Sequence, residues 1–269
     1  MIDFKLAGGL LAMIAAFSPA RGQEPAADVQ LLTPAELVEI GFSRSRVVMM
    51  NEAHDGLKRS KRTRLIGRLV LPRAHAAGVR HLAAEALTAS FAEKANRTRQ
   101  VPEAEHSYLA QPDLRELLQA ALDLGWALIA YEAESGQQPP FDDPVDAVNW
   151  REAEQGTKLA NAVLKLGPDA RVLVWCGNSH LSKQSGTGPG GKEFKPMARV
   201  FWDRSELEPF SIDQTTTVDF DGTGSRGKPW LERYEKQLRQ SAAGALGLLR
   251  DEPSRSEDAI VIALDNSMQ

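Results

Sequence analysis

Four short apolar runs, separated by stretches with helical spacing, constrain the fold of this chain more than any other feature. They lie at residues 47–50, 81–87, 127–134 and 171–180, within VVMM, HLAAEAL, ALIAYEAE and RVLVWCGNSH. Between them, LRELLQAALDLG ends at Gly125 and DAVNWREAEQGTKLANAVLKLG ends at Gly167. Continuous apolar runs are typical of strands buried on both faces. The alternation therefore predicts an α/β fold, with a mostly parallel sheet and helices on both faces.

The domain organisation follows from the length and from the ends of the chain. With 269 residues, 42% hydrophobic and 25% charged, we expect a single domain over residues 46–269. An amino-terminal arm, residues 23–45, precedes it, and Thr33 is expected to cap a helix starting at Pro34. Beyond Phe201 we expect a strand, an amphipathic helix and a last strand in DAIVIAL. The inward positions predicted for that helix are Leu231, Tyr234, Leu238 and Leu249.

The first 22 residues have the layout of a cleaved secretory signal peptide. Lys5 precedes an apolar core at residues 6–17, and the small residues Ala20 and Gly22 follow. No cysteine stands directly after the apolar core and no later segment is apolar enough to span a bilayer, so we expect no stable membrane anchor. The sequence thus predicts an exported protein, periplasmic or secreted. Its single cysteine, Cys176, excludes an internal disulfide.

Charge argues against a nucleic-acid partner. The formal net charge is -4 and the sequence pI is about 5.8, whereas a phosphate backbone requires a basic face. Basic residues do cluster in LKRSKRTR, residues 57–64. We interpret this run as a solvated helix face, and the alternative is an anion-attracting rim beside a site.

Polar side chains stand at the end of each of the four predicted strands. In chain order they are Glu52 and His54, then Glu85, then Tyr131, Glu132 and Glu134, then Asn178 and His180. The carboxyl ends of parallel strands meet at one edge of a sheet, where ligands bind. The sequence therefore predicts a shared site at this edge, in which a carboxylate could orient a histidine that acts as a general base.

Three of these stretches resemble the superfamily of erythromycin-esterase-like, ChaN-like haem-uptake and Tiki-type proteins. NEAHDG is similar to its GE-x-H-D/G motif, AAEAL to its second-strand glutamate, and VLVWCGNSHLSK to its later G-N-x-H strand end. The resemblance covers residues 47–201, because the arginine-bearing helix NWREAEQGTKLANAVLKL and the segment KPMARVF also match in order. One departure is Asn51, which stands where the family has glycine.

The resemblance implies a role for each matching residue. His54 corresponds to the general base or metal-facing histidine, Glu52 to its partner acid, and Glu85 to the second-strand carboxylate. His180 corresponds to the second histidine, and Arg151 to an arginine that binds the substrate or a carboxylate. We expect Glu132, Tyr131 and Asn178 to complete the substrate-binding set. The alternatives are that Glu52 caps the next helix, that Arg151 is a surface partner of Gln155, and that Glu132 is a solvated loop acid.

Other motifs carry less chemistry. GTGPGGKE, residues 186–193, lacks the Ser or Thr of a phosphate-binding loop, and we interpret it as a mobile flap beside His180. Cys176 lies in an apolar strand and is expected to be a buried inert thiol. His75, His81 and His106 are expected to be structural. The spacing supports no structural zinc site, but a catalytic divalent metal gathered from separate strands stays open.

Two functions compete at this stage. The first is a hydrolase of an ester, lactone or amide, acting on a small molecule or peptide, in which His54 activates water while His180 and Arg151 hold the developing negative charge. The second is a haem or small-ligand carrier, with His180, His54 or Tyr131 as the iron ligand. Several acids at the strand ends favour hydrolysis, because a haem pocket needs a broad apolar wall. The residues specify neither substrate, metal nor oligomeric state.

Overall fold

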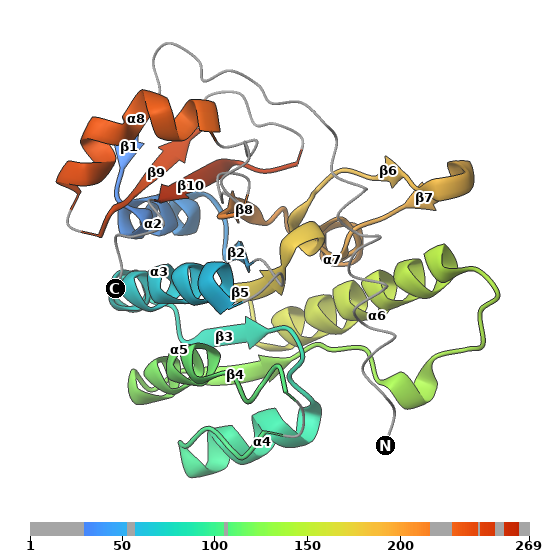
Figure 1. Ribbon diagram of the computed structural model, residues 1–269. Helices are drawn as coiled ribbons and strands as arrows, with labels where there is room; N and C mark the ends of the chain where they lie inside the picture. The colour runs from blue at the N-terminus through green and yellow to red at the C-terminus, as the bar shows by residue number, and fades with distance from the viewer. Residues whose placement is uncertain are drawn as a thin grey trace.

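A computed structural model of the chain describes residues 30–52, 57–104, 107–215, 228–241, 243–250 and 256–263. Within these residues one eight-stranded sheet forms the centre of an α/β domain (Figure 1). Its strands are β1 (Leu31–Leu32), β2 (Val47–Glu52), β3 (His81–Ala84), β4 (Ala127–Ala130), β5 (Val172–Gly177), β8 (Phe210–Asp213), β9 (Ala245–Leu249) and β10 (Ala259–Ala263). The helices are α2 (Pro34–Arg44), α3 (Leu57–Ala76), α4 (Ala89–Thr98), α5 (Pro112–Asp123), α6 (Pro144–Lys165), α7 (Met197–Ser205) and α8 (Lys228–Gln240).

The sheet is mostly parallel, which confirms the predicted fold class. Its strand order is β1-β9-β10-β8-β2-β5-β3-β4, and every pair from β10 to β4 runs parallel. Only β9, beside β10, and the edge strand β1 pair antiparallel. Consequently β2, β3, β4, β5 and β8 all point their carboxyl ends to the same edge.

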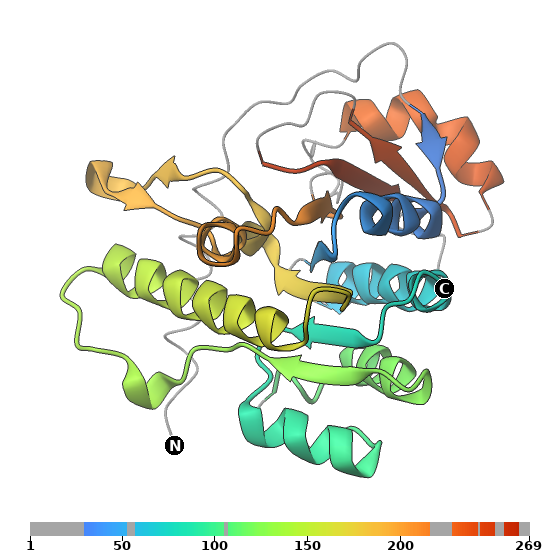
Figure 2. The same ribbon diagram turned by 180° about the vertical axis from the view of Figure 1, so that it is seen from behind.

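Helices cover both faces of this sheet. The apolar sides of α2, α3, α4 and α5 pack in one core cluster with residues such as Val48 and Met50 of β2. The opposite face packs against α6 and α7 through Val47 and Met49, and against α8 through β9 and β10. Figure 2 shows α6 running along its face, with its amino-terminal end toward a small two-stranded hairpin. Successive residues of β2 thus alternate between the two cores.

The start of the described chain belongs to the domain. Leu31 and Leu32 pair with β9, and α2 follows as expected, with Thr33 as its N-cap and Glu36 closing a capping box. The residues of the arm from Leu31 onward therefore add an edge strand and a covering helix. The proposed signal peptide, residues 1–22, lies outside the described residues.

The carboxyl ends of three strands come earlier than the apolar runs indicate. The β3 strand stops at Ala84, and Ala86 adopts a positive φ of 66° that an extended strand does not allow. The β4 strand stops at Ala130. The β5 strand stops at Gly177, and residues Asn178–Leu181 turn into the short 3-10 helix η3. The candidate site residues therefore stand on loops just beyond the strands.

Two other expectations are corrected. Leu249 does not lie on the amphipathic helix, because α8 ends at Gln240 and Leu249 is the last residue of β9. The basic run at residues 57–64 begins α3, but it is not simply a solvated face. Arg62 and Arg64 are 5% and 1% exposed, so part of this run is buried. None of the helices in the described ranges combines the length and apolarity needed to cross a bilayer.

Candidate functional site

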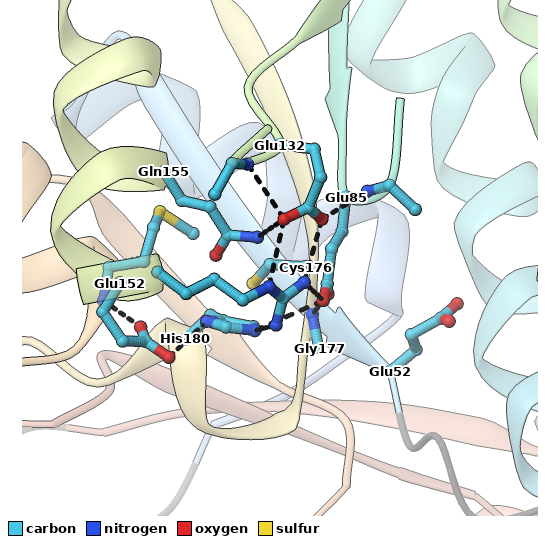
Figure 3. A network of polar contacts seen from close by, with 12 residues as sticks. Glu52, Glu85, Glu132, Glu152, Gln155, Cys176, Gly177 and His180 are labelled. Carbon is cyan, nitrogen blue, oxygen red and sulfur yellow. Dashed lines mark hydrogen bonds and ion pairs between the residues drawn. The ribbon is translucent and has the colours of Figure 1, made fainter. Parts of the chain in front are cut away.

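A cluster of charged side chains gathers at the carboxyl ends of β3, β4 and β5, on the face covered by α6 (Figure 3). Glu85 follows β3, Glu132 follows β4, and His180 lies in η3 after β5. Arg151 reaches them from the second turn of α6. The structure thus brings together four of the residues that the sequence singled out.

Arg151 is the centre of this cluster. Its Nε lies 3.0 Å from Oε1 of Glu132, and its Nη2 donates to Oε2 of Glu132 at 2.8 Å and to Oε1 of Glu85 at 2.7 Å. Although burial disfavours the charged guanidinium, Glu132 and Glu85 outweigh this and raise the pKa of Arg151 further above its ordinary value. In the described part of the chain, Nη1 has only a 3.4 Å contact with Nε2 of His180. Because Nη1 carries two N–H groups and has this one contact, it keeps donor capacity for a ligand.

His180 is held between carboxylates on both ring nitrogens. Its Nδ1 lies 2.8 Å from Oε1 of Glu152, and its Nε2 lies 3.3 Å from Oε1 of Glu85. The Glu152 contact is an ion pair off the ideal N–H direction rather than a well-aligned hydrogen bond. Burial disfavours the charged ring, but Glu152 and Glu85 outweigh it and raise the pKa of His180 to about 10. The ring is therefore protonated at neutral pH.

Glu85 is the anion shared by both cations. Besides Arg151 and His180, its carboxylate accepts the backbone N–H of Gly177 through Oε2, at 2.5 Å. Its side chain is 6% exposed. A carboxylate so fully engaged by donors is better suited to holding the cations than to taking a proton from water.

The exposed side of the cluster identifies its entrance. The side chains of Arg151 and Glu132 are 28% and 18% exposed, whereas those of His180 and Glu152 are 4% and 1% exposed. A ligand from solvent therefore meets Arg151 and Glu132 first, with His180 behind them.

Two members of the cluster, Glu152 and Gln155, were missed by the sequence analysis. Glu152 accepts the backbone N–H of Met197 through Oε2 at 2.5 Å, and Nε2 of Gln155 donates to Glu132 at 2.8 Å. Both are almost fully buried. The sequence does contain a signal for these two residues. The inward face of α6 repeats at helical spacing, through Val148, Glu152, Gln155 and Leu159. A glutamate in such a stripe indicates a paired buried charge.

Glu52 lies apart from this cluster (Figure 3). It follows Met50 on the β2 face that packs against α3, where its oxygens accept from Nε and Nη2 of Arg64, both at 2.7 Å. Tyr108 and Trp175 also donate to it, each at 2.6 Å. With 0% exposure and these donors, Glu52 anchors the end of β2. Its oxygens point to Arg64, Tyr108 and Trp175 rather than to Glu85. The residues that lead into α3, 53–56, lie outside the described residues, so the capping alternative stays a prediction.

The residues beside Glu52 form a second polar group. His54, the predicted general base, lies outside the described residues. Asn51 points to the α6 face, where its Nδ2 donates to Asp213 at 2.8 Å and its Oδ1 accepts from the backbone N–H of Gln214 at 2.7 Å. Asn178, expected to bind substrate, accepts from Thr215 at 2.6 Å in this same group. Asn51 thus ties β2 to β8, a link that the glycine of the family motif could not make.

Tyr131 differs from its expected role in substrate binding. It is 1% exposed, and its hydroxyl donates to the backbone oxygen of Trp175 at 2.8 Å. Burial raises the pKa of Tyr131 well above its ordinary value, so the phenol stays neutral. Cys176 is fully buried beside it, and burial likewise raises the pKa of its thiol, as expected of an inert cysteine.

His75 and the Gly-rich segment have structural partners. Trp126 donates to Nδ1 of His75 at 2.9 Å, and burial lowers the pKa of His81. His106 lies outside the described residues. The predicted flap forms the hairpin of β6 (Gly186–Thr187) and β7 (Glu193–Phe194), and Lys192 ties it to the start of α6.

The described residues bear on the metal and haem alternatives in two ways. Nowhere among them are three His, Cys, Asp or Glu side chains grouped so that they could hold a metal ion. Of the haem ligands considered, Tyr131 is occupied by a backbone oxygen, and His180 has a carboxylate beside each nitrogen.

Comparison with known proteins indicates the fold. No protein family model matches the chain, and no curated protein matches it. Among solved structures, the type III effector HopBA1 aligns with a TM-score of 0.54 and 15% identity, over 91% of this chain and 100% of that one. At this identity the likeness shows a shared fold alone.

Two further structures align with lower scores. RRSP, a MARTX toxin effector domain from Vibrio vulnificus, has a TM-score of 0.48 and 15% identity, over 77% of this chain and 38% of that one. A haem-binding ChaN of Campylobacter jejuni has a TM-score of 0.46 and 11% identity, over 88% and 98%. The solved structures that the chain resembles thus include toxin effectors and a ChaN protein. The resemblance to erythromycin-esterase-like and Tiki-type proteins stays a prediction.

Proposed function

We propose that this protein is an exported hydrolase of an ester, lactone or amide bond, acting at the cluster around Arg151 and His180. One observation carries the proposal. Nη1 of Arg151 and Nε2 of His180 lie 3.4 Å apart, and both are N–H donors when the ring is protonated. Two cationic groups this close together attract an oxygen that develops negative charge, as the carbonyl oxygen does during hydrolysis.

Each residue then has a distinct task. Arg151 and His180 stabilise the oxyanion, while Glu85 and Glu132 fix the guanidinium in position. Because His180 is already protonated, it cannot also take the proton from the attacking water. We assign that step to His54, two residues beyond the anchored end of β2. The protonated His180 could afterwards donate a proton to the leaving group.

The test is turnover by the purified mature protein on a panel of esters, lactones, amides and peptides. We expect hydrolysis of at least one substrate class. A haem titration of the same preparation supplies the alternative outcome. If no member of the panel is hydrolysed, and haem instead binds with a Soret shift that His54→Ala or His180→Ala abolishes, the protein is a carrier and the hydrolase proposal fails.

Export is proposed on the sequence alone. An apolar core at residues 6–17 followed by Ala20 and Gly22 suits a signal peptidase, so the mature chain is expected to begin near Gln23. Mass spectrometry of the protein from the periplasm or the medium measures this directly. An exported chain that retains Met1 would contradict cleavage, and a chain found only inside the cell would contradict export.

A further inference from the structure

Glu152 makes two contacts that together place a negative charge directly against His180. Its Oε1 lies 2.8 Å from Nδ1 of the imidazole, and its Oε2 accepts the backbone N–H of Met197, the first residue of α7. The amino-terminal end of a helix stabilises a carboxylate through its free N–H groups and its dipole. With 1% exposure, this carboxylate is shielded from water and stays aimed at the ring.

Charged groups approach His180 from several elements. Glu152 and Arg151 come from α6, Glu85 from the end of β3, and Glu132 from the end of β4 through Arg151. The nearby thiol of Cys176 on β5 stays neutral, because burial raises its pKa. Glu85 is shared between Arg151 and His180, whereas the only cation that Glu152 contacts among the described ion pairs is His180.

We propose that Glu152 is a positioning residue that keeps His180 protonated, so that the ring acts as an oxyanion-binding group and proton donor and never as the base. The role of Glu152 rests on the proposed hydrolase function, but the charge on His180 can be measured without any substrate. The raised pKa of His180 agrees with this assignment.

The substitution Glu152→Gln tests the proposed role of Glu152 with little change in the shape of the side chain. The amide oxygen can still accept from Met197, which turns the amide NH2 group toward Nδ1 of His180. A donor there favours the neutral ring, with its remaining proton on Nε2. We expect the pKa of His180 to fall by about 1–3 units, the usual effect of losing an adjacent opposite charge.

The measurement is a pH titration of the histidine ring nitrogens by nitrogen-15 NMR, with His180 identified by the signal that His180→Gln removes. Glu154→Gln, on the same helix but turned partly to solvent, is the control and should leave the titration unchanged. An unchanged pKa of His180 in Glu152→Gln would overturn the proposal. If Glu152→Gln does not fold, Glu152→Asp replaces it, because the aspartate retains the charge at a greater distance from the ring. We expect Glu152→Asp to lower the pKa of His180 by a smaller amount. An unchanged pKa of His180 in this variant would also overturn the proposal.

Activity gives a second, separate readout. If the protein is a hydrolase, the basic limb of the pH profile of kcat/KM should move to lower pH in Glu152→Gln, while activity at acid pH is largely kept. A loss of activity equal at every pH would indicate a structural role instead. If no substrate is turned over, the proposed function fails while the NMR result still decides the role of Glu152.

Discussion

At the scale of single residues, two arginines illustrate two uses of the same side chain. Arg64 is 1% exposed and is engaged by Glu52, Asp113 and Gln111, so it has little capacity for a ligand. Arg151 is 28% exposed and keeps Nη1 available. Burial makes the ion pair of Arg64 and Glu52 structural. Arg151 can bind a ligand, because its side chain is partly exposed and Nη1 keeps donor capacity.

Replacing Arg64 by Met tests the structural pair. The variant leaves the carboxylate of Glu52 buried without its cation, and breaking such a pair costs about 3–5 kcal/mol in the free energy of unfolding. Urea denaturation measures this. Arg68→Met, on the same helix as Arg64, is the matched control. The side chains of Arg68 and its partner Glu116 of α5 are 40% and 58% exposed, so this ion pair is worth less than about 1 kcal/mol. Equal losses in both variants would contradict the assignment of Glu52.

The site residues differ in how far the sequence could predict them. Glu85, Glu132 and His180 follow apolar runs, so their place at one sheet edge is predictable from strand order and direction. Glu52 also ends a strand, but the face it takes depends on the alternation along β2 and on Arg64, twelve positions away. A basic run such as residues 57–64 gives no sign of which arginine is buried, because this depends on partners distant in sequence.

At the scale of elements, α6 carries three residues of the site and is held in place at its start and at its middle. Asp143 caps its start by accepting from the backbone N–H of Val145 at 2.8 Å. Gly156 allows α7 to approach, since a Cβ there would lie 2.6 Å from Cβ of Val200. Arg151, Glu152 and Gln155 are therefore presented by a rigid helix, as precise placement of catalytic groups requires.

The β6–β7 hairpin is fastened to this helix by Lys192. Its Nζ lies 2.6 Å from Asp143 and 2.9 Å from Asp146, all partly exposed. In Lys192→Met we expect cleavage by subtilisin between residues 186 and 191 to accelerate by up to about fivefold, the effect of losing a surface ion pair. Mass spectrometry of the fragments measures it.

Lys195→Met is the control for the hairpin, since Lys195 pairs with Asp203 of α7 and not with α6. Its cleavage rate should stay near that of the wild type. An unchanged rate in Lys192→Met would show that the backbone contacts of the hairpin, such as Asn149 to the oxygen of Glu193, hold it without the ion pair.

Whether a segment forms a helix or a strand is predictable from the sequence where its apolar pattern is long. The helices ending near Gly125 and Gly167 and the four central strands follow the sequence pattern. Leu249 was placed on a helix because GALGLL is too short to show a period, and only pairing of β9 with β10 makes it a strand. The apolar runs predict strands that are longer than those in the structure. The reason is that a turn of the chain, such as the one at Ala86 with its positive φ, does not change the hydrophobic pattern of the sequence.

At the scale of the whole molecule, the sheet explains why residues from 85 to 180 meet. Parallel order β5-β3-β4 sets three strand ends side by side, and α6 returns across them. The fold shared with HopBA1 at 15% identity carries no function by itself. The proposed function therefore depends on the two donors, Arg151 and His180, and on His54, which follows β2 in the sequence by two residues.

The central claim is tested most directly by kcat/KM for the best substrate of the panel in Arg151→Met, His180→Gln and His54→Ala, with folding checked by circular dichroism. Loss of an oxyanion donor or of a positioned base should lower kcat/KM by about a hundredfold or more in each variant. The control is His75→Ala, in the last turn of α3 at the opposite end of the sheet, where Trp126 loses an acceptor but the site is untouched. This control should keep near wild-type kcat/KM. Folded variants of Arg151 and His180 that lose no more activity than His75→Ala would contradict it.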